Sequence, residues 1–307
     1  MVQENCLNKV IVICGPTASG KTALAVECAK LLNSEVISAD SMYIYKNMNV
    51  GTAKPNLVEM QGITHHLIDV IEPNESFSVS DYKKLADPIV KDLISNGKIP
   101  IICGGTGFYI NSLLYDLSYG NGECDPSVRE KYKLLAQEKG AAYVYEILKN
   151  LDPDSAEKLH FNDTKRVIRA LEIYESGIKK SDIKDSFTPK YDYRAYSIDF
   201  PRDVLYERIN ARVDNMINNG LLEEINSLIS SGISNGHQCM QAIGYKEILD
   251  YLDGNCTLDQ AIDSIKLNTR HYAKRQITFF KKLNVVKLKP DSVENLAKTI
   301  IKDVIND

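Results

Sequence analysis

Short apolar runs alternate with amphipathic segments over the first third of the chain. Four runs have the length and composition of strands buried in a sheet: KVIVIC at 9–14, EVIS at 35–38, HHLIDV at 65–70 and IPIICGG at 99–105. The segments between them place apolar residues at helical spacing, as in ALAVECAKLLN at 23–33. This alternation predicts a parallel sheet covered by helices, which is an α/β fold.

The pattern changes between about residues 120 and 195, where strand-like runs disappear. Helices punctuated by Gly or Pro are expected at 127–140, 141–151, 153–159 and 163–177, followed by a mobile polar loop at 178–193. A strand is expected at 194–200 and helices from Arg202 onward, the first bearing Leu205, Ile209, Val213 and Met216. We predict an α/β core of 1–119 and 196–307, interrupted by an all-helical insertion domain at 120–195.

The composition is that of a globular protein. The 307 residues are 44% hydrophobic, enough for one large domain and a smaller one. No apolar run approaches ~20 residues and no signal peptide is evident, so we expect a cytoplasmic protein without a membrane partner. The seven cysteines form no C-x-x-C pair. Reduced, mostly buried thiols are therefore expected, with neither disulfides nor a zinc site.

Charge is distributed unevenly. The net charge of −4 argues weakly against a nucleic-acid partner, but residues 264–289 contain eight Lys or Arg and no Asp or Glu. Three of these line one side of a helix, either as a polyanion-binding stripe or as a solvated face: Lys266, Arg270 and Lys274. Three residues of the same stretch suit contacts with bases and riboses, although aromatic residues at this spacing are more often core: Tyr272, Gln276 and Phe280.

The segment GPTASGKT at 15–22 fits the phosphate-loop pattern G-x-x-x-x-G-K-[ST] between an expected strand and helix. Gly15 and Gly20 permit a tight loop whose N–H groups converge on an anion, and Lys21 adds a charged donor. Thr22 is placed to bind a Mg²⁺ shared with the phosphates. The pattern predicts a P-loop NTPase-like core and leaves open whether phosphate is hydrolysed, transferred or released.

Two further segments place polar residues at the ends of expected strands, where ligands of open α/β sheets bind. Asp40 could coordinate Mg²⁺, accept a proton or merely cap the next helix. Thr106 could donate to a phosphate or base, or belong to an ordinary Gly-rich turn. His65 and His66 face opposite sides of a strand and are interpreted as structural, and Asp69 receives no sharper assignment.

Basic residues recur in two other helical segments. Lys165 and Arg169 share a helix face, with Arg166 beside them, and a solvated, salt-bridged helix explains them equally well. Arg208 and Arg212 lie one turn apart on a later helix.

Eight segments, in this order, resemble the tRNA dimethylallyltransferases, also called tRNA isopentenyltransferases. The resemblance spans Gly15 to Phe280, and its specificity lies in the combination: GPTASGKT, ISADSMYIYKNMNVGTAKP, HHLIDV, GGTGFYI, NDTKRVIRALE, RVDNMINNGLLEEI, QAIGYKE and TRHYAKRQITFF.

The resemblance implies transfer of a dimethylallyl group from dimethylallyl diphosphate to N6 of adenosine 37, beside the anticodon, with diphosphate as the leaving group. It implies that Asp40 is the general base, that Thr106 bonds the bridging oxygen or a neighbouring donor, and that Lys21 neutralises departing charge. The diphosphate, with Mg²⁺ on Thr22, would be held by Gly15, Pro16, Thr17, Ala18, Ser19, Gly20, Lys21, Thr22 and Arg212, with Arg208 as the alternative arginine.

The resemblance further implies that the tRNA anticodon stem-loop flips its adenosine into the site. The residues expected to contact tRNA are Asp40, Ser41, Met42, Tyr43, Thr106, Lys165, Arg166, Val167, Ile168, Arg169, Gln241, Gly244, Tyr245, Lys246, Arg270, Lys274 and Arg275. A monomer is expected because catalysis is complete within one chain.

Two residues depart from the family pattern. Tyr43 stands where glutamine is usual after DSM, so base discrimination is expected to differ, whereas Phe279 replaces tryptophan after QIT and keeps an aromatic ring. Some eukaryotic relatives continue into a zinc-binding tail, and the end at Asp307 favours the bacterial form. The alternatives left open are a nucleoside or small-molecule kinase, which would consume ATP, and an RNA-binding P-loop protein that transfers no group.

Overall fold

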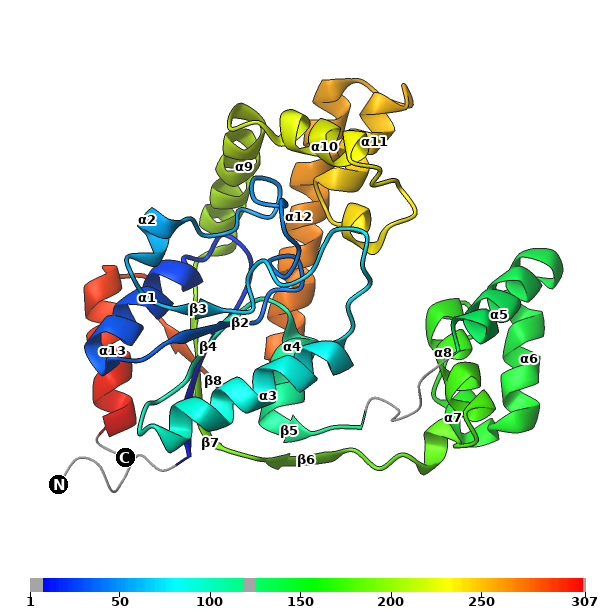
Figure 1. Cartoon of the computed structure of the whole chain (residues 1–307), viewed down its shortest axis with the longest axis horizontal. Helices are drawn as coiled ribbons and strands as arrows, with labels where there is room; N and C mark the ends of the chain where they lie inside the picture. The colour runs from blue at the N-terminus through cyan, green and yellow to red at the C-terminus, as the bar shows by residue number, and fades with distance from the viewer. Residues whose placement is uncertain (1–7, 119–124, 306–307) are drawn as a thin grey trace. The chain divides into compact units, whose positions relative to one another are not determined.

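The computed structural model describes residues 8–118 and 125–305, and Figure 1 shows the order of its elements. The strands are β1 Lys9–Cys14, β2 Val36–Ser38, β3 His65–His66, β4 Ile101–Gly104, β5 Tyr115–Asp116, β6 Ser186–Pro189, β7 Asp192–Ile198 and β8 Val285–Leu288. The helices are α1 Lys21–Leu32, α2 Leu57–Met60, α3 Val79–Ser95, α4 Gly107–Leu114, α5 Pro126–Lys139, α6 Ala141–Leu151, α7 Pro153–Glu157, α8 Thr164–Glu175, α9 Arg202–Asn218, α10 Leu221–Ser230, α11 Tyr245–Leu252, α12 Leu258–Phe280 and α13 Val293–Ile305, with short 3₁₀ turns η1 Lys180–Asp182 and η2 Gln238–Gln241.

Six strands form a parallel sheet in the order β3-β2-β4-β1-β7-β8. The central strand β1 pairs with β4 on one side and β7 on the other, so that Ile11 lies opposite Ile101 and Arg194. Every residue of β1 is buried, as expected for a strand covered on both faces. The α/β prediction is confirmed, and the phosphate loop that follows β1 opens at the same edge as the ends of β2 and β4.

Helices packed on this sheet fix the strand ends that carry the site. α1 and α13 pack together and share a core with β1 and β4 that includes Leu24 and Ile300 (Figure 1). α3 packs on α4, where the rings of Tyr82 and Tyr109 stack with centroids 3.9 Å apart. The Tyr82 hydroxyl also donates to the Ser38 carbonyl at 2.9 Å, which ties α3 to the last residue of β2.

The chain divides into two compact units, Met1–Leu114 with Pro189–Asp307 and Tyr115–Thr188. The smaller unit is built from α5 to α8 around a core that includes Val144, Leu148 and Leu171. The predicted insertion ended too late, at residue 195, because β7 of the larger unit already begins at Asp192.

Three strands differ from the prediction for physical reasons. β8 lies beside β7 where only helices were expected, because its sequence VVKL is short and half exposed and lacks a continuous apolar run. β6 is fully exposed, lies within the predicted polar loop and pairs with β5. β3 ends at His66 because Leu67 and Asp69 have φ angles of 63° and 55°, which extended strands do not adopt.

The described cysteines are free thiols, as predicted. Cys14, Cys28, Cys103 and Cys239 are buried and Cys256 is partly exposed, while Cys6 and Cys124 lie outside the described residues. Burial raises the pKa of Cys14, Cys28 and Cys103 to about 12, so these thiols stay protonated. Within 8–118 and 125–305, no helix combines the length and apolarity needed to cross a bilayer.

Candidate active site

The phosphate loop is shaped by its own backbone. Gly15 and Gly20 adopt φ angles of 132° and 83°, which glycine accepts without steric cost. The Pro16 carbonyl accepts hydrogen bonds from the Ser19 hydroxyl at 2.8 Å and the Lys21 ammonium at 2.6 Å. No side chain caps the start of α1, and its first turn carries no acidic residue. The N–H groups there are therefore available to an anion.

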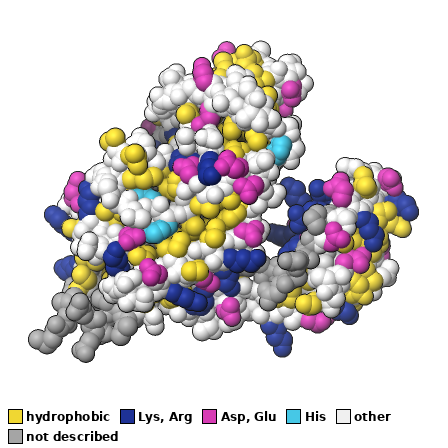
Figure 2. Space-filling model, in the orientation of Figure 1, with side chains coloured by type: hydrophobic (Ala, Val, Ile, Leu, Met, Phe, Trp, Pro, Cys, Tyr) yellow, Lys and Arg dark blue, Asp and Glu magenta, His cyan; other side chains and the backbone are white. Residues whose placement is uncertain are grey.

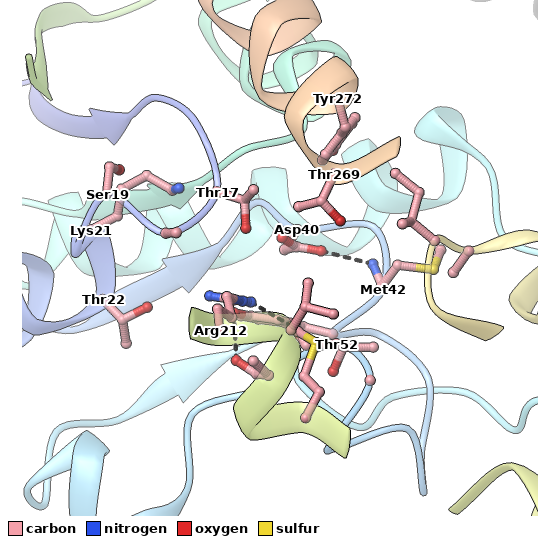
Figure 3. A pocket seen from close by; sticks show the side chains of 18 of the residues that line it. Thr17, Ser19, Lys21, Thr22, Asp40, Met42, Thr52, Arg212, Thr269 and Tyr272 are labelled. Atoms are coloured by element: carbon pink, nitrogen blue, oxygen red, sulfur yellow. Dashed lines mark hydrogen bonds between the residues drawn. The ribbon is translucent and has the colours of Figure 1, made fainter. Parts of the chain in front are cut away.

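A cavity of about 800 Å³ opens over this loop. Figure 3 shows that side chains from the loop, from the segment after β2, from α9 and from α12 face the same space. The residues lining it include Thr17, Lys21, Thr22, Asp40, Ser41, Met42, Tyr43, Thr52, Arg208, Arg212, Gln241, Lys246, Thr269, Tyr272, Arg275 and Gln276. The structure thus brings the phosphate loop and Asp40 together in one cavity.

Positive charge surrounds the loop side of the cavity. Burial lowers the pKa of Lys21, and Arg212 acts in the same direction, whereas Cys103 and Asp40 act against it. Arg212 Nη2 donates to the Thr52 carbonyl at 2.8 Å, and Arg208 Nε donates to the Ala18 carbonyl at 2.8 Å. Both arginines reach the cavity, Arg208 at the phosphate loop itself and Arg212 beside Thr52.

Asp40 is held where β2 and β4 end. Its Oδ1 accepts the Met42 N–H at 3.0 Å, so the carboxylate caps a turn and not the helix considered above. Ala39 N–H donates to the Cys103 carbonyl at 2.8 Å, and the Ala39 carbonyl accepts the Thr106 N–H at 3.0 Å. A Cβ at Gly104 would lie 2.2 Å from the Ala39 oxygen, so only glycine allows this close approach of the two segments.

Thr106 lies next to the cavity without lining it. Its Oγ1 accepts the Ser41 N–H at 3.0 Å and lies 3.3 Å from the Ser41 hydroxyl. Burial, followed by the charge of Asp40, raises the pKa of Tyr272, so its hydroxyl remains protonated beside the carboxylate. Thr106 is therefore connected to the cavity through Ser41.

The predicted tRNA-contacting residues of the larger unit fall into two groups. Those that line the cavity are Asp40, Ser41, Met42, Tyr43, Gln241, Lys246 and Arg275. On α12, Lys274 is exposed and Arg270 is partly buried against Asn210 Oδ1 at 3.4 Å. Gly244 and Tyr245 are buried, and the Tyr245 hydroxyl donates to Glu224 at 2.6 Å. Their contact with tRNA stays a prediction.

In the helical unit, the predicted contact segment 165–169 spans two faces of α8. Lys165 and Arg166 are exposed, and Arg169 pairs with Glu172 at 3.1 Å. Val167 and Ile168 are only 0% and 5% exposed, and their side chains pack in the core of this unit. Their contact with tRNA stays a prediction. Figure 2 shows Lys and Arg side chains at several places on the visible face of this unit, with Asp and Glu side chains between them.

The remaining polar candidates have structural partners. His66 Nε2 contacts Glu35 at 2.6 Å and His65 Nδ1 contacts the Ile63 carbonyl at 2.9 Å, in line with the structural interpretation of both. Asp69 pairs with Lys54 at 2.6 Å. Across the described ranges 8–118 and 125–305, no group of three or more His, Cys, Asp or Glu side chains is arranged to hold a metal ion.

Two residues have roles that the sequence did not predict. Gln276 was expected to contact bases or riboses, but its side chain is 4% exposed and bridges the phosphate loop and the turn after β4. Glu224 accepts the N–H groups of three residues in the loop that lines the cavity, at 2.6, 2.7 and 3.0 Å from Asn49, Val50 and Gly51. Gln276 and Glu224 bind residues that lie far from them along the chain, so no local sequence pattern predicts these contacts.

The chain is similar to known proteins over nearly its whole length. The family model described as IPP transferase matches residues 43–283. A tRNA dimethylallyltransferase of Caldanaerobacter subterraneus subsp. tengcongensis is 49% identical over 292 residues, which cover 91% of this chain and 90% of the relative. The tRNA dimethylallyltransferase of Acetivibrio thermocellus is 46% identical, with 96% of each chain covered.

Solved structures give the same result. The full-length tRNA isopentenylpyrophosphate transferase of Bacillus halodurans superimposes with a TM-score of 0.73 at 41% identity, and 97% of each chain is covered. A eukaryotic dimethylallyltransferase captured acting on tRNA superimposes with a TM-score of 0.81 at 30% identity, covering 98% of this chain and 79% of that one.

Proposed function

Because this chain belongs to the IPP transferase family and is a tRNA dimethylallyltransferase, we propose that it prenylates N6 of adenosine 37 in tRNA with dimethylallyl diphosphate as donor. The comparisons support a prenyl-transferring enzyme and not the kinase considered above. One observation carries the proposal that adenosine 37 is the acceptor and dimethylallyl diphosphate the donor: the phosphate loop and Asp40 line the same cavity.

The proposed reaction is a substitution at C1 of the donor. The lone pair of adenosine N6 forms the new N–C1 bond while the C1–O bond breaks, and that bond's electron pair leaves with the diphosphate. The N6 proton passes to the Asp40 carboxylate. An exocyclic amine is a poor nucleophile, so a positioned base and a stabilised leaving group both lower the barrier.

The diphosphate is proposed to lie on the N–H groups of the loop and the start of α1, against Lys21 and Arg212. We propose Arg212 over Arg208 because Arg212 is partly buried and its charge acts on Lys21, whereas Arg208 is exposed. Thr22 lines the cavity, and its hydroxyl would be a ligand for a Mg²⁺ bound with the diphosphate. When bound, Mg²⁺ would neutralise charge on the leaving diphosphate.

The acceptor is proposed to be the anticodon stem-loop of a tRNA, bound by one monomer in the cytoplasm. Adenosine 37 must leave the base stack to reach Asp40, and we propose that it is flipped toward Met42, Tyr43 and Tyr272. Exposed Lys165, Arg166 and Lys274 are proposed to contact phosphates, which position RNA without reading its sequence.

The test is an incubation of the protein with Mg²⁺, dimethylallyl diphosphate and an unmodified tRNA that carries A36 and A37. Mass spectrometry of the digested tRNA is expected to show a C5H8 unit added to adenosine, with one diphosphate released per transfer. A tRNA with guanosine at position 37 serves as the control. Consumption of ATP with nucleosides and no adduct on tRNA would refute the proposal in favour of a kinase.

A further inference from the structure

Gln276 of α12 belongs to the cavity wall but has no part in the proposed reaction. Its buried side chain reaches two segments far from α12 in sequence. Oε1 accepts the Thr17 N–H at 2.9 Å, and Nε2 donates to the Gly105 carbonyl at 3.0 Å. One amide therefore connects the phosphate loop with the turn that follows β4.

The chemistry of the two partners fixes the orientation of this amide. A backbone N–H requires an acceptor and a carbonyl requires a donor, so the carboxamide satisfies both with its oxygen toward Thr17 and its nitrogen toward Gly105. The backbone at Gly105 leaves room for it, since a Cβ there would lie 2.1 Å from Gln276 Nε2. Because the side chain is 4% exposed, water is poorly placed to replace either bond.

Gln276 binds the peptide group between Pro16 and Thr17, and the carbonyl of that peptide binds the Lys21 ammonium. The Thr17 N–H and the Pro16 carbonyl belong to the same planar peptide group. Gln276 binds its N–H, whereas Ser19 and Lys21 bind its carbonyl at 2.8 and 2.6 Å. Rotation of this peptide would move the acceptor that holds the Lys21 ammonium, so the Gln276 amide limits where that charge lies.

We propose that Gln276 is a positioning residue for the diphosphate of the donor. It holds the Pro16 and Thr17 peptide in the orientation that places Lys21 and Ser19. The same amide holds Gly105, whose neighbour Thr106 binds the segment of Asp40 through Ser41. α12 thereby sets the distance between the diphosphate end and the acceptor end of the cavity. This inference rests on the proposed function of the cavity.

The test compares Gln276→Leu, Gln276→Glu and the control Thr278→Val, whose hydroxyl bonds only within α12 in the contacts described. Binding of inorganic diphosphate with Mg²⁺ is measured by calorimetry, beside tRNA affinity, thermal midpoint and steady-state transfer. Gln276→Leu is expected to weaken diphosphate binding by about 10-fold to 100-fold, which corresponds to the loss of buried hydrogen bonds. The donor KM rises and kcat falls, while tRNA affinity and the control stay at wild-type values.

The Gln276→Glu variant separates the two hydrogen bonds. An ionised carboxylate still accepts from Thr17 but faces the Gly105 carbonyl without a proton to donate. Diphosphate affinity, taken as a ratio to wild type at each pH, is therefore expected to recover as the pH falls and the introduced carboxyl is protonated.

Wild-type diphosphate affinity in both Gln276 variants would overturn the inference. Equal losses of diphosphate and tRNA affinity, together with a lowered thermal midpoint and no pH-dependent recovery, would also overturn it, because Gln276 would then only support α12. Failure of the proposed function is distinguishable, since it appears as absent prenyl transfer in the wild-type protein, whatever the diphosphate affinity.

Discussion

Asp40 serves two purposes with its two carboxylate oxygens. Oδ1 accepts the Met42 N–H and so keeps the side chain in a fixed turn at the end of β2. The carboxylate as a whole lines the cavity, where the hydroxyl of Tyr272 and the ammonium of Lys21 are near enough to feel its charge. If Asp40 is the proposed base, this hydrogen bond orients it before substrate binds.

Replacing Asp40 by asparagine is expected to remove the base while keeping the turn, because the amide oxygen can still accept from Met42. The rate of prenyl transfer in a single turnover is expected to fall about 10²-fold to 10⁴-fold, the usual contribution of a general base. tRNA affinity, measured by filter binding, is expected to stay unchanged. The control is Asp92→Asn on the exposed side of α3. A transfer rate close to wild type in Asp40→Asn would show that Asp40 is not the base.

The residues of the site that could be predicted from sequence are those with local patterns. The phosphate loop is defined by eight consecutive residues, and Asp40 by its place after a short apolar run. Gln276 and Glu224 bind backbone groups of distant segments, which no spacing reveals. Val167 and Ile168 belong to a segment that the family resemblance assigns to tRNA, although their helical positions place their side chains in the core.

At the scale of elements, α10 stabilises the loop between β2 and α2. Oε2 of Glu224 accepts hydrogen bonds from the N–H groups of Asn49 and Val50. Oε1 accepts hydrogen bonds from the Gly51 N–H and from the Tyr245 hydroxyl. The next residue, Thr52, lines the cavity, and its carbonyl accepts a hydrogen bond from Arg212. The carboxylate therefore connects the position of α10 to one wall of the active site.

The Glu224→Gln substitution tests this connection. It replaces one acceptor oxygen by an amide group that meets donors, so a loss of about 1–3 kcal/mol in the free energy of unfolding is expected. Urea titration measures the loss, and the donor KM is expected to rise because Thr52 and Arg212 are less fixed. The neighbouring Glu223→Gln, an exposed position, is expected to stay within about 0.5 kcal/mol of wild type. Equal stability of the two variants would contradict the role of Glu224.

The helical unit has a buried carboxylate of its own. Glu172 receives hydrogen bonds from Arg129 Nη2 at 3.0 Å and Arg169 Nη1 at 3.1 Å. Burial acts to raise the pKa of Glu172, but these hydrogen bonds outweigh it and lower the pKa below its usual range. A carboxyl with a depressed folded-state pKa stabilises the fold above its unfolded pKa and loses that contribution as the pH falls through the folded value.

Glu172→Gln is therefore expected to destabilise the helical unit near pH 7 by about 1–3 kcal/mol. The difference from wild type is expected to shrink below about pH 4, where the glutamate of the unfolded chain and then of the folded chain is protonated. Amide hydrogen exchange of α5 to α8 between pH 7 and values below about 4 measures this stability difference. Glu157→Gln on the exposed side of α7 is the control. A difference that does not change with pH would exclude a role for the carboxylate charge.

Over the whole molecule, charge is acidic on average and basic where RNA is proposed to bind. The net charge is −4, yet 264–289 carries eight Lys or Arg and no Asp or Glu. Part of this charge is already paired, as Lys266 lies 2.6 Å from Asp214. Exposed Lys274 is therefore a better candidate for a phosphate contact than the stripe as a whole.

Lys274→Gln is expected to weaken tRNA binding at low salt and to reduce the slope of log affinity against log salt by about 1, because one fewer cation is released from the RNA. Titrations at several salt concentrations measure this slope. Lys302→Gln on α13 is the control, since it makes the same change in net charge at an exposed position outside 264–289. An unchanged slope in Lys274→Gln would place this lysine away from the phosphates.

The molecular organisation was largely predictable, because the apolar runs of β1, β2 and β4 are buried on both faces of the sheet and have the clearest sequence pattern. The exposed strand β6 and the half-exposed strand β8 lack that pattern, and the sequence does not predict them for that reason. Strands at the edge of a sheet are thus harder to predict from sequence than the buried strands at its centre.

The chain leaves the larger unit at Leu114 and returns at Pro189, and the two ends are joined by a hydrogen bond of 2.8 Å from Lys190 N–H to the Leu114 carbonyl. A gap that narrow can be closed by a short turn, since inserted segments are best tolerated where their ends lie close together. The helical unit is thus an insertion whose two ends meet at one point of the larger unit, so its removal would leave the strand order of the sheet unchanged.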